Sequence, residues 1–289
     1  MAASTAGMVA RQRFGAALKQ ARLQAPTPIK QIEAARKIGR KTVDRVSRFE
    51  RGEAWPEPKE LKALCALYGA DDATRARLEM MLTEGRAIAH AWWAEFEGEF
   101  PESLTEFIAY EDSASAITTC VSNVVPGILQ SEDYGRALTS YNARSTMAPN
   151  LVERSVQLRR LRRGVFDKPN PLTVEAIVGE AAIRQRIGGS EVMLRQLDAL
   201  VEDVTQRDVT VRVIPFEAQS TLTYTFHILD FDGAGDRPIA AFDAMTGMSF
   251  KKDKKEVLGL KEFVKSLREL ALSPEDSLTR IKSARKDFA

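Results

Sequence analysis

Two short amphipathic segments near the N-terminus, residues 31–39 and 42–52, constrain the fold more than any other feature. Each places apolar residues at helical spacing: Ile32, Ala35 and Ile38 in the first, and Val43, Val46 and Phe49 in the second. Gly39 and Gly52 end the two segments, and Thr42 is the expected N-cap of the second. Two short helices separated by about four residues predict a helix-turn-helix.

Three further helices are expected around this pair. RQRFGAALKQARLQ is amphipathic and predicts a helix that ends near Leu23. PEPKELKALCALYGADD predicts a helix from Pro58 to Tyr68 and another from about Asp72. Leu61, Leu64, Cys65 and Leu67 would close the core of this bundle. We therefore expect a five-helix domain over 13–85, preceded by a flexible tail over 1–12.

The charge of this region favours a polyanionic partner. Residues 11–51 hold twelve Lys and Arg but three acidic residues, although the whole chain carries a net charge of only +2. A helix fits the major groove, where arginine can bond guanine and hold phosphates. We expect contacts with double-stranded DNA from the exposed residues of the second helix: Lys41, Asp44, Arg45, Arg48 and Arg51. A solvated face without a nucleic-acid role is the alternative.

The spacing EAARKIG, VSRFERG, a proline, two leucines and YG resembles the DNA-binding domain of XRE-type (lambda-repressor-like) transcription regulators, over about Arg13 to Gly85. The resemblance implies that Gln31 contacts phosphate and that Thr42, Asp44, Arg45 and Arg48 read bases. It also implies a structural ion pair between Glu50 and Arg22. QAPTPIK and GRKTVDRV depart from the family pattern, so the register of the base-reading residues stays open by one position.

An acidic, aromatic stretch follows. Between Arg86 and Arg136 there is no Lys or Arg, but there are nine acidic residues and several aromatic ones. We expect residues 86–135 to form a connector that packs as one or two helices. Its acidic side is a candidate surface for a basic partner, or for docking on the basic N-terminal domain.

The remainder predicts a mixed domain. PLTVEAIVG, VTVRVIPF, YTFHILDF and PIAAFDAM have the length and apolar content of strands. NVVPGILQSEDY combines a strand-like run with a Pro-Gly turn and an N-cap at Ser131, and Ser190 is the expected N-cap of the helix after RIGG. The fold class is mainly α with a C-terminal α+β part, in which helices flank a sheet of about four strands.

YEDSASAI, VVPGILQSEDYGRAL and VGEAAIRQRIGGSEVMLRQLDAL resemble a C-terminal domain of unknown function that follows XRE-type domains in actinobacterial regulators, including WhiJ-type regulators of development. The resemblance extends over most of Phe107 to Asp243. It implies that residues 86–289 receive a small-molecule effector or a small companion protein.

The sequence predicts no enzyme activity, no cofactor and no metal site. The two histidines, His90 and His227, are isolated, and RIGGSE lacks the third glycine of a dinucleotide fingerprint. Cys65 and Cys120 lie in apolar stretches and should be buried thiols. No apolar run reaches the length of a membrane span, so we expect a cytoplasmic protein that is at the nucleoid when bound to DNA.

These features favour a sequence-specific DNA-binding transcription regulator. We expect a homodimeric repressor whose C-terminal domain supplies the dimer contacts and receives the ligand or partner. The alternative is an antitoxin-like interaction protein, which holds a small companion protein and binds DNA mainly for autoregulation.

Overall fold

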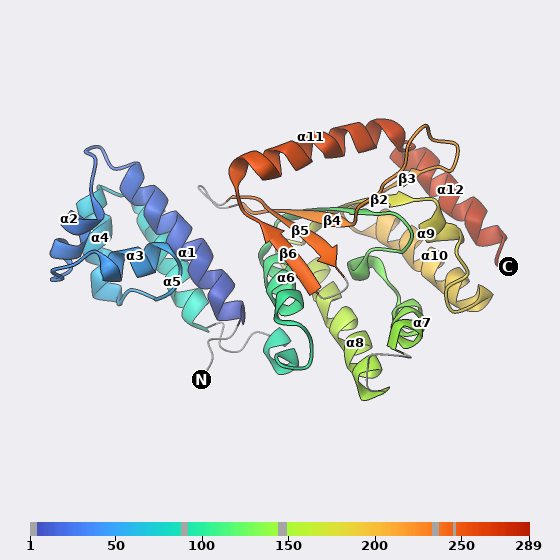
Figure 1. Cartoon of the computed structure of the whole chain (residues 1–289), viewed down its shortest axis with the longest axis horizontal. Coiled ribbons are helices and arrows are strands. Elements are labelled where there is room, and N and C mark those ends of the chain that lie inside the picture. The colour runs from blue at the N-terminus through green and yellow to red at the C-terminus, as the bar shows by residue number, and fades with distance from the viewer. Residues whose placement is uncertain (1–4, 88–91, 144–148, 233–236, 245–246) are drawn as a thin grey trace. The chain divides into compact units, whose positions relative to one another are not determined.

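The computed structural model describes residues 5–87, 92–143, 149–232, 237–244 and 247–289 (Figure 1). The chain divides into two compact units. The first holds the described residues up to Glu97 together with Asp232, and the second holds those of Gly98–Phe231 and Arg237–Ala289. The boundary at residue 97 lies twelve residues after the one that the sequence predicted, and part of the expected connector belongs to each unit.

The described part of the first unit is helical throughout. Its elements are α1 (Thr5–Leu23), α2 (Gln31–Lys37), α3 (Asp44–Glu50), α4 (Pro58–Tyr68), α5 (Asp72–Ala87) and a 3-10 helix, η2 (Trp92–Phe96). The sequence predicted α4 with the same ends because Pro58 occupies the first turn, where its missing N–H is not needed, and Gly69 follows with a φ of 64°.

Helix α1 begins at Thr5, so the flexible tail predicted over 1–12 is wrong for residues 5–12. Residues 11 and 12 of this helix contact the end of α3. Arg11 Nε donates to the Gly52 carbonyl oxygen (3.3 Å), and a Cβ on Gly52 would lie 2.5 Å from Gln12 Cα. Gly52 has a φ of 72°, which turns the chain away after α3. Residues before Phe14 therefore support the helix-turn-helix.

Side chains from α1, α2, α3, α4 and α5 form the core of the first unit. Its fully buried members include Phe14, Leu18, Ala35, Val46, Phe49, Leu61, Leu64, Cys65, Tyr68 and Leu78. Leu67 is only partly buried. Val43 was expected to face inward, but 40% of it is exposed, because α3 begins one residue after it.

The second unit contains a six-stranded mixed sheet of order β3-β2-β1-β4-β5-β6. The strands are β1 (Ala116–Val121), β2 (Thr173–Gly179), β3 (Val209–Ile214), β4 (Phe226–Asp230), β5 (Ile239–Ala244) and β6 (Gly247–Lys251). β1, β2 and β3 are parallel, whereas β4, β5 and β6 continue the sheet with antiparallel pairs.

The sequence located four of these strands and missed β1 and β6. β1 has two threonines and follows a helix directly, and β6 is a largely polar edge strand. The strand-like run expected at NVV is wrong. Val125 instead lies in a loop, where its N–H donates to the Tyr134 hydroxyl and its carbonyl accepts from Gln130.

Helices cover both faces of the sheet (Figure 1). They are α6 (Glu102–Ser113), η3 (Gly127–Leu129), α7 (Glu132–Ala143), α8 (Pro149–Arg162), η4 (Arg163–Asp167), α9 (Ala181–Arg184), α10 (Ser190–Gln206), α11 (Lys254–Leu270) and α12 (Pro274–Lys286). α11 crosses one face, and α6 and α8 lie on the other. Cys120, Ile177 and Phe226 pack with Val257 and Val264 of α11.

Of the two N-caps predicted in this unit, the structure confirms Ser131 but not Ser190. Ser131 Oγ accepts from the Tyr134 N–H (3.3 Å), as expected of an N-cap. Ser190 does not cap α10, since Gly189 occupies the N-cap with a φ of 94°.

Both cysteines are buried free thiols, and burial raises the pKa of Cys120 to about 12. Within the described ranges, no helix combines the length and the apolar character needed to cross a bilayer.

Candidate nucleic-acid interface

The turn between α2 and α3 runs from Ile38 to Val43, two residues longer than the four that the sequence suggested. Gly39, with a φ of 74°, reverses the chain after α2. Thr42 was predicted as the N-cap of α3, but it lies in the turn and Val43 takes that position without a side-chain hydrogen bond. Lys41 and Thr42 are exposed. The turn itself therefore presents residues that were expected on the recognition helix.

Arg22 of α1 and Glu50 at the end of α3 form a buried bidentate ion pair. Arg22 Nε and Nη2 lie 2.6 and 2.9 Å from the two carboxylate oxygens of Glu50. Arg22 Nη1 also donates to the Ile29 carbonyl (2.8 Å), before α2. Hydrogen bonding to Glu50 raises the pKa of Arg22, although burial opposes this. One guanidinium thus joins α1, the entry of α2 and the end of α3.

The side-chain amide of Gln31 also bonds to Glu50, the acidic partner of Arg22. Its Nε2 donates to Glu50 Oε2 (2.8 Å). The family resemblance implies a phosphate contact for Gln31, yet this N–H group already has a carboxylate acceptor. A phosphate would have to be held by the amide's other N–H or by a rearranged side chain.

Arg45 was predicted to read bases, but its side chain turns toward α4. Arg45 Nε and Nη2 donate to the two oxygens of Glu60, both at 2.9 Å, and its guanidinium lies 5.0 Å from the Phe49 ring centre. Glu60 also accepts from the Glu57 N–H (2.8 Å). Burial opposes ionisation, but hydrogen bonds from Arg45 and Glu57 lower the pKa of Glu60. Sequence reasoning missed Glu60, because its partner is 15 residues away.

The exposed end of α3 carries Arg48 and Arg51, and an acidic residue lies beside them. Arg51 Nε and Nη2 lie 2.6 and 3.0 Å from the oxygens of Glu53, and Arg48 Nε is 3.9 Å from Glu53. Arg51 Nη1 also donates to Ser47 Oγ. Because these groups are exposed, a phosphate could exchange with the carboxylate. Glu53, which directly follows the helix-ending glycine, was not among the predicted site residues.

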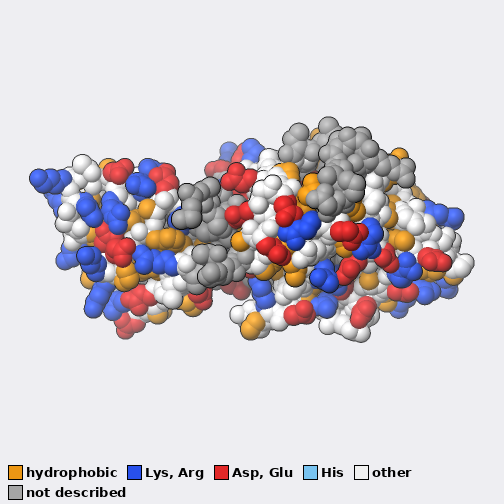
Figure 2. Space-filling view, turned by 90° about the horizontal axis from the view of Figure 1, so that it is seen from below, with side chains coloured by type: hydrophobic (Ala, Val, Ile, Leu, Met, Phe, Trp, Pro, Cys, Tyr) orange, Lys and Arg blue, Asp and Glu red, His pale blue; other side chains and the backbone are white. Residues whose placement is uncertain are grey.

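The charged surface of the first unit fits a polyanion. Lys and Arg side chains are spread over the face of this unit shown at the left of Figure 2. The exposed candidates on α2, the turn and α3 are Arg36, Lys37, Arg40, Lys41, Asp44, Arg48 and Arg51. The exposed acidic residues of these elements are Glu33 and Asp44, which lie in the first turns of α2 and α3, where the helix dipole favours a negative charge.

The acidic stretch after residue 86 is largely paired inside the second unit. At least five of its nine acidic residues form ion pairs there: Glu99 with Arg154, Glu106 with Lys252, Glu111 with Arg162, Asp112 with Lys168, and Asp133 with Arg136 and Arg195. Tyr110 and Phe107 of the same stretch are buried. The surface open to a basic partner is smaller than the sequence suggested.

His227 is buried on β4, where Nε2 lies 3.6 Å from Asp243 of β5 and its ring is 4.9 Å from that of Phe107. Burial acts to raise the pKa of Asp243, but the hydrogen bond and charge of His227, together with the charge of Arg162, lower it. His90 lies outside the described residues. In the part of the chain that the structure describes, no group of three His, Cys, Asp or Glu is placed to hold a metal ion.

Comparisons with known proteins agree with this division of the chain. Residues 13–78 match the model of a family described as a helix-turn-helix domain, and residues 104–283 match that of a domain of unknown function, DUF5753. No curated protein and no solved structure matches the chain. The second match covers more than half of the chain. The protein therefore belongs to the DUF5753 family, with an XRE-like helix-turn-helix domain at its N-terminus.

Proposed function

We propose that the protein is a sequence-specific DNA-binding transcription regulator that acts in the cytoplasm and has no catalytic activity. One observation carries the proposal. The Arg22–Glu50 pair fixes α3 against α1 and the entry of α2, while Lys41, Arg48 and Arg51 remain exposed around the turn and α3. A rigid helix with exposed cations at one surface suits groove and phosphate binding.

The first experiment is to map the DNA sites bound by the full-length protein, and to measure affinity for a recovered site by fluorescence anisotropy. We expect K41A and R48A each to weaken binding about tenfold, the order of one lost charged contact, and to reduce the salt dependence. R75A is the matched control, because Arg75 lies on α5 and pairs with Asp72. If K41A and R48A bind as tightly as R75A, the assigned surface is wrong.

We further propose that the regulator is a homodimer and acts as a repressor. The support is the size of the reading element: α3 has seven residues, too few for tight and specific binding by one copy. Two copies would bind half-sites about one helical turn apart. Sedimentation of the protein with the recovered site should show two chains per DNA; a 1:1 complex of full affinity contradicts the dimer.

A further inference from the structure

A pocket of about 440 Å³, lined mostly by charged and polar residues, lies in the second unit between η4, the start of α7 and the end of α8. Four arginines line it: Arg159, Arg160, Arg163 and Arg207. Two acidic residues, Glu132 and Asp167, also line it, together with Ser131 and Gln130. Its volume is within the range of small-molecule sites.

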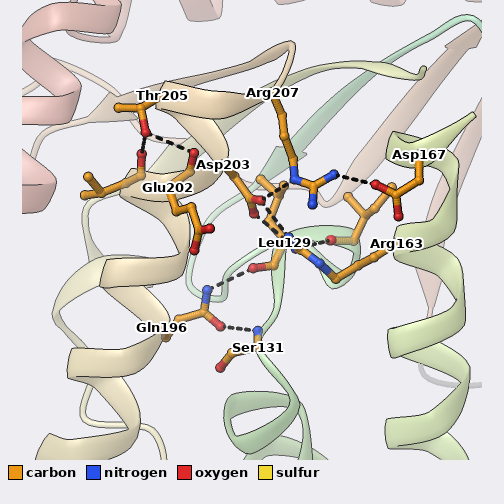
Figure 3. A network of polar contacts seen from close by, with 11 residues as sticks. Leu129, Ser131, Arg163, Asp167, Gln196, Glu202, Asp203, Thr205 and Arg207 are labelled. Carbon is orange, nitrogen blue, oxygen red and sulfur yellow. Dashed lines mark hydrogen bonds and ion pairs between the residues drawn. The ribbon is translucent and has the colours of Figure 1, made fainter. Parts of the chain in front are cut away.

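Two of the arginines, Arg163 and Arg207, already have carboxylate partners (Figure 3). Arg163 donates to both oxygens of buried Asp203 at 2.6 and 3.0 Å, and Arg207 lies 3.3 Å from the same carboxylate. Arg207 also donates to Asp167 (3.2 Å). Gln196 accepts from the N–H of Ser131, which lines the pocket, and donates to the Leu129 carbonyl.

Arg159 differs, because its hydrogen-bond partners among the described residues are all neutral. Its Nε donates to Gln130 Oε1 (2.8 Å), and its Nη1 to the carbonyl and hydroxyl oxygens of Ser155. Burial, and then the charge of Arg162, lowers the pKa of Arg159 to about 10, so it remains charged at neutral pH. A largely buried cation without a counterion is unfavourable unless something compensates it.

The local backbone makes room for this arginine. Gly135 lies within α7, and a Cβ there would be 2.8 Å from Arg159 Cδ. Glycine inside a helix costs stability relative to alanine. Gly135, a residue that disfavours helix, therefore lies where the aliphatic part of the Arg159 side chain packs against α7. Arg160 is exposed at the same pocket and forms no ion pair with a described residue. Glu132, also exposed in the pocket lining, forms no ion pair with a described residue, although its charge acts on Arg136, and it offsets part of the positive charge.

We propose that this pocket binds a small molecule through an oxyanion group, a phosphate or a carboxylate, held by Arg159 and Arg160. Guanidinium groups bind both kinds of oxyanion through charge-assisted hydrogen bonds. The ligand supplies the negative charge that Arg159 lacks. Its role as the effector of the regulator rests on the proposed function, whereas the binding itself does not.

The binding test uses isothermal titration of the full-length protein at constant ionic strength, with pyrophosphate and citrate as probes and chloride as the blank. We expect saturable binding of at least one probe, and the preferred probe separates phosphate from carboxylate recognition. R159Q and R160Q should each weaken binding at least tenfold. E132Q should strengthen it about threefold to tenfold, because it removes a repelling charge at the rim. R186Q is the control, since Arg186 is exposed outside the pocket.

R160Q and E132Q concern exposed residues, so they keep the test decisive if R159Q does not fold. Absence of saturable binding, or equal affinity for the wild type, R160Q and E132Q, overturns the proposal. Operator affinity is then measured with and without the saturating probe, where we expect a change of at least fivefold. If the wild type binds the probe but no DNA, the proposed function fails and the anion site stands. If it binds DNA with unchanged affinity, only the effector role fails.

Discussion

Both oxygens of Glu60 accept hydrogen bonds from Arg45, which places a predicted base-reading residue in an ion pair between α3 and α4. Glu60 is also the acidic residue that accepts from Glu57 N–H at the start of α4. One carboxylate therefore both caps α4 and orients α3. Arg45 acts first as a structural residue, and a direct DNA contact would require it to leave Glu60.

The Arg45–Glu60 pair can be measured with a double-mutant cycle in urea. We expect a coupling energy of about 0.5–1 kcal/mol, because a third of the Arg45 side chain is exposed and the pair is screened. E60A should be the more destabilising single change, since it also removes the acceptor of the Glu57 N–H. R48A, on the exposed side of α3, serves as the control. Additivity of R45A and E60A would contradict the coupling.

The pH dependence of this pair follows from the lowered pKa of Glu60. A carboxyl whose folded pKa is depressed stabilises the fold above its unfolded pKa, about 4.3 for Glu, and loses this contribution as pH falls through the folded pKa. The difference in unfolding free energy between wild type and E60Q should be constant near neutral pH and shrink below about pH 4. Urea titrations from pH 7 to pH 3 check this. A difference that grows on acidification would have the wrong sign.

Loss of either partner in the Arg22–Glu50 pair should be far more damaging. The Arg22 and Glu50 side chains are only 10% and 3% exposed, so removing one leaves a buried charge. R22A and E50A should each cost about 3–5 kcal/mol of unfolding free energy. R36A, an exposed change on α2, should stay within about 0.5 kcal/mol. If denaturant unfolding finds R22A as stable as R36A, the Arg22–Glu50 pair does not stabilise the fold.

Glu53 offers a change that should strengthen DNA binding. Its carboxylate bonds Arg51 and lies near Arg48, so it competes with phosphate for both arginines. E53Q should raise affinity for DNA of any sequence and steepen the salt dependence of binding. Anisotropy titrations at several salt concentrations give both values. E57Q, which removes an acid from the N-cap of α4, is the matched comparison. Weaker binding by E53Q would contradict the assignment of Arg48 and Arg51 to the DNA-binding surface.

Two glycines should respond to alanine with opposite signs. A Cβ on Gly15 would lie 2.4 Å from the Phe49 carbonyl oxygen, whereas one on Gly259 in α11 meets no atom within 4 Å. G15A should therefore destabilise by about 1–3 kcal/mol by overpacking α1 against α3. G259A should stabilise by about 0.5–1 kcal/mol, because alanine favours the helix. Thermal unfolding distinguishes the two. A neutral G15A would mean that α1 does not cross α3 so closely.

The sequence and the structure describe the acidic stretch differently. Along the chain, residues 87–135 have no Lys or Arg, which favoured an open surface for a basic partner. In the fold, Glu111 bonds Arg162, 51 residues away, and Glu106 lies 3.2 Å from Lys252. Figure 2 shows acidic and basic side chains next to one another on the second unit. Charge that is segregated in sequence is therefore partly neutralised in space.

The sequence by itself determined the features that depend on near neighbours. The ends of α4, the glycines after α2 and α3, and four of the six strands follow from periodicity, caps and turn residues a few positions apart. Only the tertiary structure decided which side chain meets which. It paired Arg45 with Glu60, placed Arg11 of α1 against Gly52, and gave Arg159 neutral hydrogen-bond partners. Those contacts depend on chain segments brought together by folding, and no local pattern encodes them.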